Sequence, residues 1–460
     1  MEYRKEKDSL GIKEVPADAY YGVQTVRALE NFAISGLKID PIFIKVYGII
    51  KKAAAMVNKE CGILNAEKAD IIIKAAEDVI SGKLDDHIKV DAYQAGAGTS
   101  FHMNINEVIA NRALELLGHP KGNYSFIHPN DDVNMSQSTN DTFPTAIRIA
   151  TILYHKQLLK ELFALLQALK NKSKEFKKVI KSGRTHLQDA LPITLGQEFG
   201  AYAEIIATQI QHLQKAIIPI HYLGVGGTAV GTGVNSPLLY SRKMVKTLSM
   251  LSGIRFKKAR NLIEKMQSMG DFTCYSAALR NHALELIKIS NDLRLMNSGP
   301  RTGLAEIELP AMQPGSSIMP GKINPSLCEA LNMICFQIVG NDLAIASASL
   351  SGQLELNVMM PLIAFNILFS QKILTNGIAM FTTKCIKGIK ANIERCRFYF
   401  ENSVSLVTLL SPKIGYEKAA ELAKESKLTG KTFFTLLEEQ NLLSPEELKK
   451  LTNLKFLTGQ

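Results

Sequence analysis

Four short segments of the chain carry most of the polar side chains that could do chemistry. They span residues 96–100, 136–141, 183–188 and 315–325, and each is rich in Gly, Ser, Thr, Asn or His. All four supply neutral hydrogen-bond donors, and the last two add a cation or a potential cation. Such a set suits a small molecule that carries two carboxylates.

The fourth segment, GSSIMPGKINP, is the most informative. Its Pro-Gly pair favours a turn that returns Lys322 and Asn324 towards the hydroxyls of Ser316 and Ser317. A serine hydroxyl is a poor base at its free pKa, so a catalytic Ser316 would need backbone N–H groups and Lys322 to stabilise its oxyanion. The G-x-S-x-G nucleophile motif is absent, which argues against an ordinary serine hydrolase.

Each segment also has an interpretation without function. Residues such as Ser138, Thr139 and Asn140 commonly begin helices, and a lone histidine such as His186 is more often structural than catalytic. The neighbouring Thr185 and the glycine before it favour function for His186. Lys322 is the stronger candidate because it precedes a helix start instead of lying on an amphipathic face.

Helices must position these segments. Apolar residues recur three and four apart over 158–169, 201–217 and 284–295, and strand-like alternation is scarce, so the fold is expected to be mainly α. Asn324 before a proline predicts the N-cap of a long helix. The tail from 411 to 460 is predicted to form a small helical unit with helices over 415–426 and 445–451, the second after a capping box at Ser444.

Composition indicates a folded protein and excludes the collagenous, disulfide-scaffold and disordered classes of protein. The chain has 460 residues, 46% of them hydrophobic, and a formal net charge of +11. The basic stretch 170–184 is interpreted as a solvated helix face, and the tail lacks a concentrated basic surface. We therefore expect no nucleic-acid partner, and nucleic-acid binding is kept as the less favoured alternative. A positive field would still favour small anionic substrates.

Several features predict a cytoplasmic location without a membrane partner. The amino terminus is too charged for a signal peptide, and the apolar stretch 358–369 is too short to span a bilayer. Six scattered cysteines are interpreted as buried thiols in a reducing compartment. No Cys, His or carboxylate cluster has metal-ligand spacing, so no metal or other cofactor is expected to be required, and the sequence does not reveal whether a divalent metal activates the protein.

The fourth segment closely resembles the signature of the fumarase and aspartase superfamily. The strings GAGTS, SQSTNDTFPTA, GRTHLQDALPITLGQEF and GGTAVGTGVN resemble its other landmarks in the expected order. The resemblance implies a mainly α, three-domain fold: an N-terminal domain (1–138), a central bundle of long helices (139–392) and a small C-terminal domain (393–460). It also implies a homotetramer whose active sites draw loops from three subunits, so that an isolated monomer would be inactive.

Within the superfamily, several positions resemble the aspartase branch. They are the YYGV string at 20–23, Thr139, Ile323 and the segment 351–357. The helix start SLCEAL at 326–331 is similar to fumarases instead, and Phe101-His102 departs from the small residue and Asn usual after the Gly-Thr motif. The resemblance implies reversible deamination of L-aspartate to fumarate and ammonia. The alternatives are class II fumarate hydratase and, less favoured, a non-catalytic relative.

The resemblance also assigns roles for a small dicarboxylate substrate. Ser316 would be the base that forms an aci-carboxylate intermediate, and His186 and Asn140 would face the leaving ammonium, with Glu329 orienting His186. One carboxylate would be held by Thr99, Ser138, Thr139, Asn140 and Ser317. The other would be held by Thr185, Lys322 and Asn324.

Overall fold

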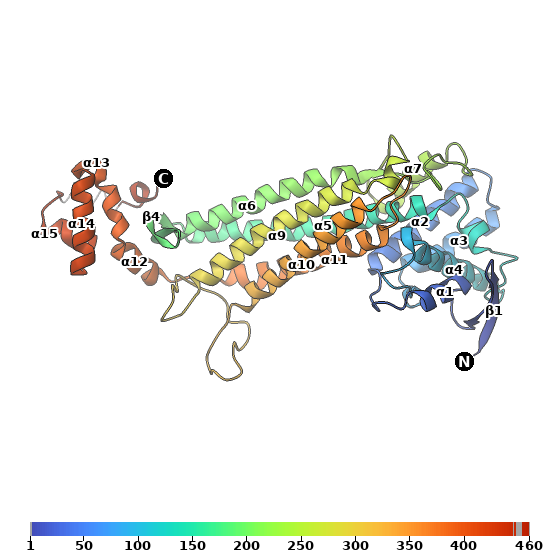
Figure 1. Cartoon of the computed structure of the whole chain (residues 1–460), viewed down its shortest axis with the longest axis horizontal. Coiled ribbons are helices and arrows are strands. Elements are labelled where there is room, and N and C mark those ends of the chain that lie inside the picture. The colour runs from blue at the N-terminus through green and yellow to red at the C-terminus, as the bar shows by residue number, and fades with distance from the viewer. Residues whose placement is uncertain (1, 445, 448–452, 460) are drawn as a thin grey trace. The chain divides into compact units, whose positions relative to one another are not determined.

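Helices dominate the computed structural model, which describes residues 2–444, 446–447 and 453–459 (Figure 1). The helices are α1 (Val23–Asn31), α2 (Pro41–Glu60), α3 (Ala66–Ile80), α4 (Thr99–Leu116), α5 (Thr139–Glu175), α6 (Leu195–Ala216), α7 (Tyr240–Ser252), α8 (Glu264–Gln267), α9 (Gly270–Met296), α10 (Ser326–Leu350), α11 (Met360–Met380), α12 (Ile393–Asn402), α13 (Ser411–Ile414), α14 (Tyr416–Thr429), α15 (Phe433–Glu439) and α17 (Leu454–Thr458).

The sheets in the described residues are all two-stranded. They pair β1 (Tyr3–Asp8) with β2 (Gly11–Pro16), β3 (Ile180–Thr185) with β4 (Gln188–Thr194), β5 (Tyr222–Leu223) with β6 (Lys257–Lys258), and β7 (Ile307–Glu308) with β8 (Lys390–Ala391). Only the β5–β6 pair is parallel. The expected mainly α fold is therefore confirmed.

The chain divides into two compact units. The first comprises Met1–Leu158, His212–Asn281 and Gln337–Leu374, and the second comprises Leu159–Gln211, His282–Phe336 and Thr375–Gln460. Five long helices, α5, α6, α9, α10 and α11, begin in one unit and end in the other. The predicted division into three domains stays a prediction.

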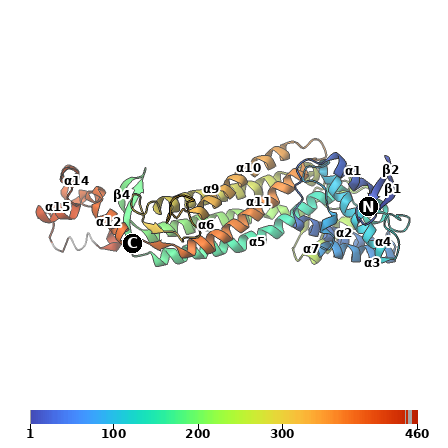
Figure 2. The same ribbon diagram turned by 90° about the horizontal axis from the view of Figure 1, so that it is seen from below.

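An aromatic cluster organises the first unit, in which α1 to α4 lie together (Figures 1 and 2). Phe43 of α2 packs with its ring centroid 5.2 Å from Phe101 of α4 and 5.0 Å from Phe143 of α5, and Tyr47 lies 5.2 Å from Phe101. All four side chains are fully buried. Because Phe101 and Phe143 stand within the first five residues of their helices, this packing holds the starts of α4 and α5 close together.

Polar contacts tie the helices of the second unit. Tyr202 of α6 donates to Asp292 of α9 at 2.9 Å, and Ser290 of α9 donates to the carbonyl of Cys328 in α10 at 2.9 Å. The chain after residue 392 adds an apolar cluster of its own, which includes Phe400, Leu422 and Leu436.

The predicted helices at 158–169, 201–217 and 284–295 lie within α5, α6 and α9, and the long helix after Asn324 is α10. The capping role of Asn324 was wrong. The helix begins two residues later, at Ser326, while the Asn324 amide donates to the Gly315 carbonyl at 2.6 Å. Its side chain closes the preceding loop instead of capping the helix.

The tail predictions have mixed outcomes. The helix at 415–426 corresponds to α14, and the capping box is present, since Ser444 N–H donates to Glu447 Oε2 at 2.8 Å and Glu447 N–H donates to Ser444 Oγ at 3.3 Å. Most of the predicted helix at 445–451 lies outside the described residues.

The observed burial of side chains differs from two expectations, one for the basic stretch 170–184 and one for the six cysteines. In the basic stretch, Lys172 and Lys181 are buried, because Lys172 donates to the Ile389 carbonyl at 2.7 Å and Lys181 pairs with acidic side chains. Four of the six cysteines are buried, but Cys274 is exposed and Cys61 is intermediate. Tertiary contacts decide whether these lysines and cysteines are buried, and such contacts cannot be seen in the sequence.

Two helical stretches, 326–350 and 360–388, are long and apolar enough to cross a bilayer by length and composition alone. The apolar stretch at 358–369, which the sequence analysis expected to be too short to span a bilayer, therefore continues into a longer apolar helical stretch. The same composition is typical of core helices in a helical bundle, and within the first unit α10 and α11 share a buried hydrogen bond from Asn341 to Ser370 at 2.9 Å.

Candidate active site

The first candidate segment forms a strained entry into α4. Ala97 and Gly98 have φ of +60° and +91°, in the left-handed region, and Thr99 is the first helical residue. A Cβ on Gly98 would lie 2.1 Å from Cε2 of Phe143, so glycine alone fits between the backbone and this ring. The Ala97 N–H donates to the Val358 carbonyl at 2.8 Å. Thr99 is exposed on this fixed turn.

The second segment forms the start of α5. Ser138 Oγ accepts from the Asn140 N–H at 3.1 Å, and Asp141 Oδ1 accepts from the Ser138 N–H at 3.0 Å. The helix-start interpretation therefore holds for these residues. Ser138, Thr139 and Asn140 are each partly exposed at this helix end.

Asp141 also ties α5 to the glycine-rich segment 224–235. Its Oδ2 accepts from the N–H groups of Gly226 at 2.8 Å and Thr228 at 3.1 Å. Asn140 adds a hydrogen bond from Nδ2 to the Ala229 carbonyl at 2.8 Å. Because Asp141 is fully buried, desolvation outweighs the backbone donors and raises its pKa to about 6.

Thr139 contacts a buried polar pair that the sequence analysis did not assign. His102 Nδ1 lies 2.7 Å from Thr139 Oγ1, and His102 Nε2 lies 2.6 Å from Lys51 Nζ. His102 is 1% exposed and Lys51 is 0% exposed. The unusual Phe101-His102 pair was the available signal in the sequence, but Lys51 lies 51 residues before His102 and carries no motif.

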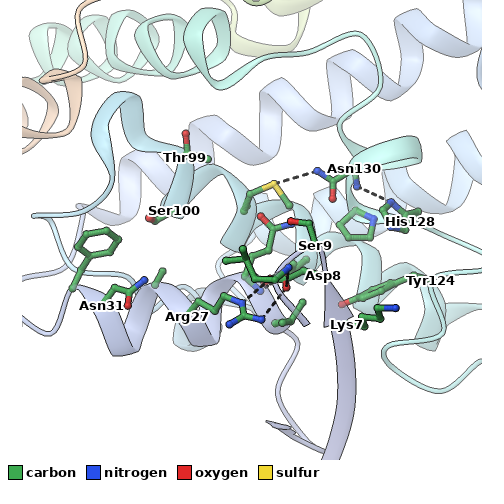
Figure 3. Close-up of a pocket in the computed structure, with 18 residues that line it drawn as sticks. Lys7, Asp8, Ser9, Arg27, Asn31, Thr99, Ser100, Tyr124, His128 and Asn130 are labelled. Atoms are coloured by element: carbon green, nitrogen blue, oxygen red, sulfur yellow. Dashed lines mark hydrogen bonds and ion pairs between the residues drawn. The ribbon is translucent and has the colours of Figure 1, made fainter. Parts of the chain in front are cut away.

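Thr99 and Ser100 also line a cavity of about 510 Å³ in the first unit (Figure 3). Arg27 in this cavity is held by Asp8, with nitrogen to oxygen distances of 2.7 and 2.9 Å, as the dashed lines in Figure 3 show. Since Asp8 holds Nε and Nη2 of Arg27 and neutralises its charge, Arg27 is a poor anchor for a substrate carboxylate.

The third segment is a β-hairpin, a form the sequence analysis did not predict. Thr185 pairs with Gln188, and the two loop residues His186 and Leu187 have φ of +55° and +58°. Two positive φ values in a two-residue loop define a type I′ turn, which normally selects Asn or Gly. A histidine and a leucine in this turn are strained, and such strain is concentrated at functional sites. Thr185 and His186 are exposed at the tip.

A buried ion cluster anchors the base of this hairpin. Glu306, which is 0% exposed, pairs with Lys181 at 2.7 Å and with Arg184 at 2.6 Å, and Lys181 also pairs with Glu198 at 2.9 Å. These acidic groups raise the pKa of Lys181 against the desolvation that opposes its charge. Lys181 and Arg184 are therefore fixed cations of the second unit.

The fourth segment forms a loop closed on itself. Gly315 N–H donates to the Lys322 carbonyl at 2.8 Å, and the Asn324 amide holds the Gly315 carbonyl. Within the loop, Ser316 Oγ accepts from the N–H groups of Ile318 at 3.2 Å and Met319 at 2.9 Å. Two donors aimed at one hydroxyl oxygen stabilise negative charge on it.

Ser316 and Lys322 line a shared hollow of about 480 Å³. Lys322 and Ser317 are exposed and Asn324 is partly exposed. Glu329 pairs with Arg294 at 3.7 Å, so the expected contact between Glu329 and His186 stays a prediction.

The predicted site residues fall into two groups, one in each unit. The first unit holds Thr99, Ser138, Thr139 and Asn140, and there the starts of α4 and α5 meet through His102. The second unit holds the rest, namely Thr185, His186, Ser316, Ser317, Lys322, Asn324 and Glu329. In the described part of the chain, no three His, Cys, Asp or Glu side chains gather as metal ligands.

This arrangement of long helices and polar loops has clear relatives. Residues 11–340 match the lyase family, and residues 406–459 match the fumarase C C-terminus. The chain is 51% identical over 450 residues to an aspartate ammonia-lyase from Bacillus sp, which covers 98% of this chain and 96% of the relative. It is 46% identical to a class II fumarate hydratase from Thermosynechococcus vestitus, with 99% and 98% covered.

A solved structure has the same fold. It is the fumarate lyase:delta crystallin from Brucella melitensis bound to cobalt, with a TM-score of 0.95, 47% identity and 99% of both chains covered. The chain therefore belongs to the lyase family that includes aspartases and fumarases, and it is an enzyme of that superfamily.

Proposed function

We propose that the protein is an aspartate ammonia-lyase that converts L-aspartate reversibly to fumarate and ammonia. The observation that carries the proposal is the environment of Ser316, whose Oγ accepts two backbone N–H groups beside Lys322. A serine needs such an environment to act as a base. The 51% identity to an aspartate ammonia-lyase favours aspartate as the substrate.

In the proposed reaction, Ser316 as an alkoxide removes a proton from the carbon beside one carboxylate. That carboxylate becomes the dianionic aci-carboxylate, and collapse of this intermediate expels the amine and leaves the double bond of fumarate. A C–H next to a carboxylate is a very weak acid, so donors must stabilise the developing charge. Thr99, Ser138, Thr139, Asn140 and Ser317 are the donors assigned to this carboxylate.

The cationic end of the site would hold the other carboxylate. Lys322 is its charge anchor, with Thr185 and Asn324 as hydrogen-bond partners. His186, on its strained turn, faces the leaving ammonium together with Asn140, and Glu329 acts in support. The amino group of L-aspartate is already protonated before its C–N bond breaks, so it leaves as neutral ammonia without a strong general acid, whereas hydroxide leaving from malate would need a proton.

We further propose a cytoplasmic homotetramer that needs no metal or other cofactor, with each site built from different subunits. The exposed apolar side chains Met333, Phe336, Leu343 and Leu350 of α10, which are between 59 and 79% exposed, support burial of this helix against other copies. Light scattering should then give four times the chain mass of 50.7 kDa. A monomer with full activity would contradict shared sites.

Replacing Ser316 with alanine tests the proposed base directly. The S316A variant should lose at least about a hundredfold in kcat, the usual contribution of a general base, while its helical circular dichroism is unchanged. Ser81→Ala, at an exposed serine after α3, is the matched control and should retain full activity. Activity of S316A within a few-fold of the parent would remove serine from the mechanism.

Class II fumarate hydratase is the second candidate. The 46% identity to such an enzyme over 99% of the chain supports it. The methyl group that distinguishes Thr139 from a serine is worth only about 1–3 kcal/mol in discrimination, so this position does not decide the substrate. Turnover of L-malate in place of L-aspartate would favour this function.

A further inference from the structure

The start of α5 rests on a series of polar contacts of which the proposed reaction uses only Thr139. Lys51 Nζ in α2 lies 2.6 Å from His102 Nε2 in α4, and His102 Nδ1 lies 2.7 Å from Thr139 Oγ1. The first two side chains are excluded from solvent, whereas Thr139 is partly exposed. These contacts therefore connect the interior of the first unit to a residue at the candidate site.

Two amide side chains define the hydrogen bonds of Lys51. Asn134 Nδ2 donates to the Gln137 carbonyl, and Gln137 Nε2 donates to the carbonyls of Val133 and Met135. Their amide nitrogens are thereby assigned, so their oxygens face Lys51 Nζ, at 3.1 Å from Asn134 and 2.9 Å from Gln137.

An ammonium group has three protons, and Lys51 faces three acceptors: these two amide oxygens and His102 Nε2. In that arrangement His102 Nε2 is unprotonated, and the neutral ring carries its proton on Nδ1. His102 then donates to Thr139 Oγ1, and the threonine's own proton stays available for a ligand.

We propose that His102, oriented by Lys51, is a positioning residue that directs the hydroxyl proton of Thr139 towards the substrate carboxylate. The contact of Thr139 with that carboxylate rests on the proposed function. The proton arrangement of Lys51 and His102 rests on the buried contacts alone.

The electrostatic surroundings agree with a neutral imidazole. Burial and the adjacent Lys51 hold the pKa of His102 well below its ordinary value. Burial holds the pKa of Lys51 well below its ordinary value, and the buried Asp141 carboxylate opposes that shift. The charged form of Lys51 therefore rests on the three acceptors that surround its Nζ. Tyr47, whose ring centroid is 5.5 Å from that of His102, is the other titratable neighbour.

The first test determines the tautomer without any substrate. In protein labelled with 15N-histidine, the His102 ring should show a protonated Nδ1 and an unprotonated Nε2, with the signals assigned by their loss in His102→Asn. An Nε2-protonated ring would overturn the proposal, because Thr139 would then have to donate its own proton to His102. This readout stands even if the enzyme turns over neither aspartate nor malate.

The second test separates positioning from packing. His102→Leu should lower kcat/KM for L-aspartate by about ten- to a hundredfold, as expected for a lost buried hydrogen bond, while His102→Asn keeps a donor near Nδ1 and should recover most of it. In a Thr139→Val background, His102→Leu should cause no further loss. Independent, multiplying losses in the double variant would overturn the proposal.

Stability measurements show whether a lower kcat/KM comes from a less stable fold. His212→Leu, at an exposed histidine of α6, is the matched control and should leave kcat/KM unchanged. If His102→Leu does not fold, the effect of His102→Asn, measured with and without Thr139→Val, decides the coupling. Both His102→Leu and His102→Asn remove the Nε2 acceptor of the buried Lys51, so both should lower the thermal unfolding midpoint. Similar midpoints of these two variants with unequal kcat/KM are expected for a positioning role.

Discussion

Asp141 offers a quantitative test of how the start of α5 is held. Its buried carboxylate accepts three backbone N–H groups, from Ser138, Gly226 and Thr228, and thereby joins α5 to the glycine-rich segment. Burial nevertheless raises its pKa from 3.8 to about 6. The informative change is Asp141→Asn, which keeps the shape of the side chain and removes its titration.

The sign and size of the effect follow from linkage between proton binding and folding. Because the folded pKa is higher than the unfolded pKa, Asp141 stabilises the fold fully below pH 3.8, and this stabilisation is lost as the pH rises through about 6. With these two values, the contribution at pH 5 exceeds that at pH 8 by about 1.4 kcal/mol. Asp141→Asn abolishes this difference.

Urea unfolding followed by circular dichroism suits a chain without tryptophan and rich in helix. The free energy of unfolding of parent minus variant should be about 1.4 kcal/mol larger at pH 5 than at pH 8. Glu107, whose pKa burial raises to about 7, titrates in both proteins, so its contribution cancels. An equal difference at both pH values would refute the reasoning, since the three N–H groups would then balance or outweigh burial.

Three further predictions concern stability and metal. Gly98→Ala should destabilise the fold by about 2–5 kcal/mol, measured by urea unfolding, because the left-handed φ and the ring of Phe143 leave no room for a Cβ; a loss below about 1 kcal/mol would contradict this. Glu306→Gln should cost about 3–5 kcal/mol, because it leaves the buried Lys181 and the partly exposed Arg184 short of one carboxylate; an unchanged urea midpoint would count against it. Removing divalent metals with a chelator should leave aspartate turnover intact, and activity that returns only when metal is restored would show a metal requirement.

Local patterns in the sequence predicted the helices well. Apolar spacing at 158–169 and 284–295 identified α5 and α9, because a helix buries one face and its period follows from the backbone alone. The four polar segments were also found without the structure, since Gly, Ser, Thr and Asn disfavour helix interiors and stand out between periodic stretches.

Contacts between residues that are far apart in the sequence were not predicted. His102 meets Lys51 and Thr139 across 51 and 37 residues, and Asp141 meets Gly226 across 85. Local spacing shows neither the burial of a charged side chain nor the partner of a polar one, so Lys181 appeared solvated and Asn324 appeared to be a helix cap. The type I′ turn at His186 was missed because its residues are not those that such turns usually select.

The most direct test of the central claim is the appearance of fumarate, followed by ultraviolet absorbance, with L-aspartate and with L-malate in parallel assays of one preparation. We expect turnover of L-aspartate by the parent and turnover at least about a hundredfold slower by S316A. Turnover of L-malate alone, or of neither compound, would contradict the assignment as an aspartate ammonia-lyase.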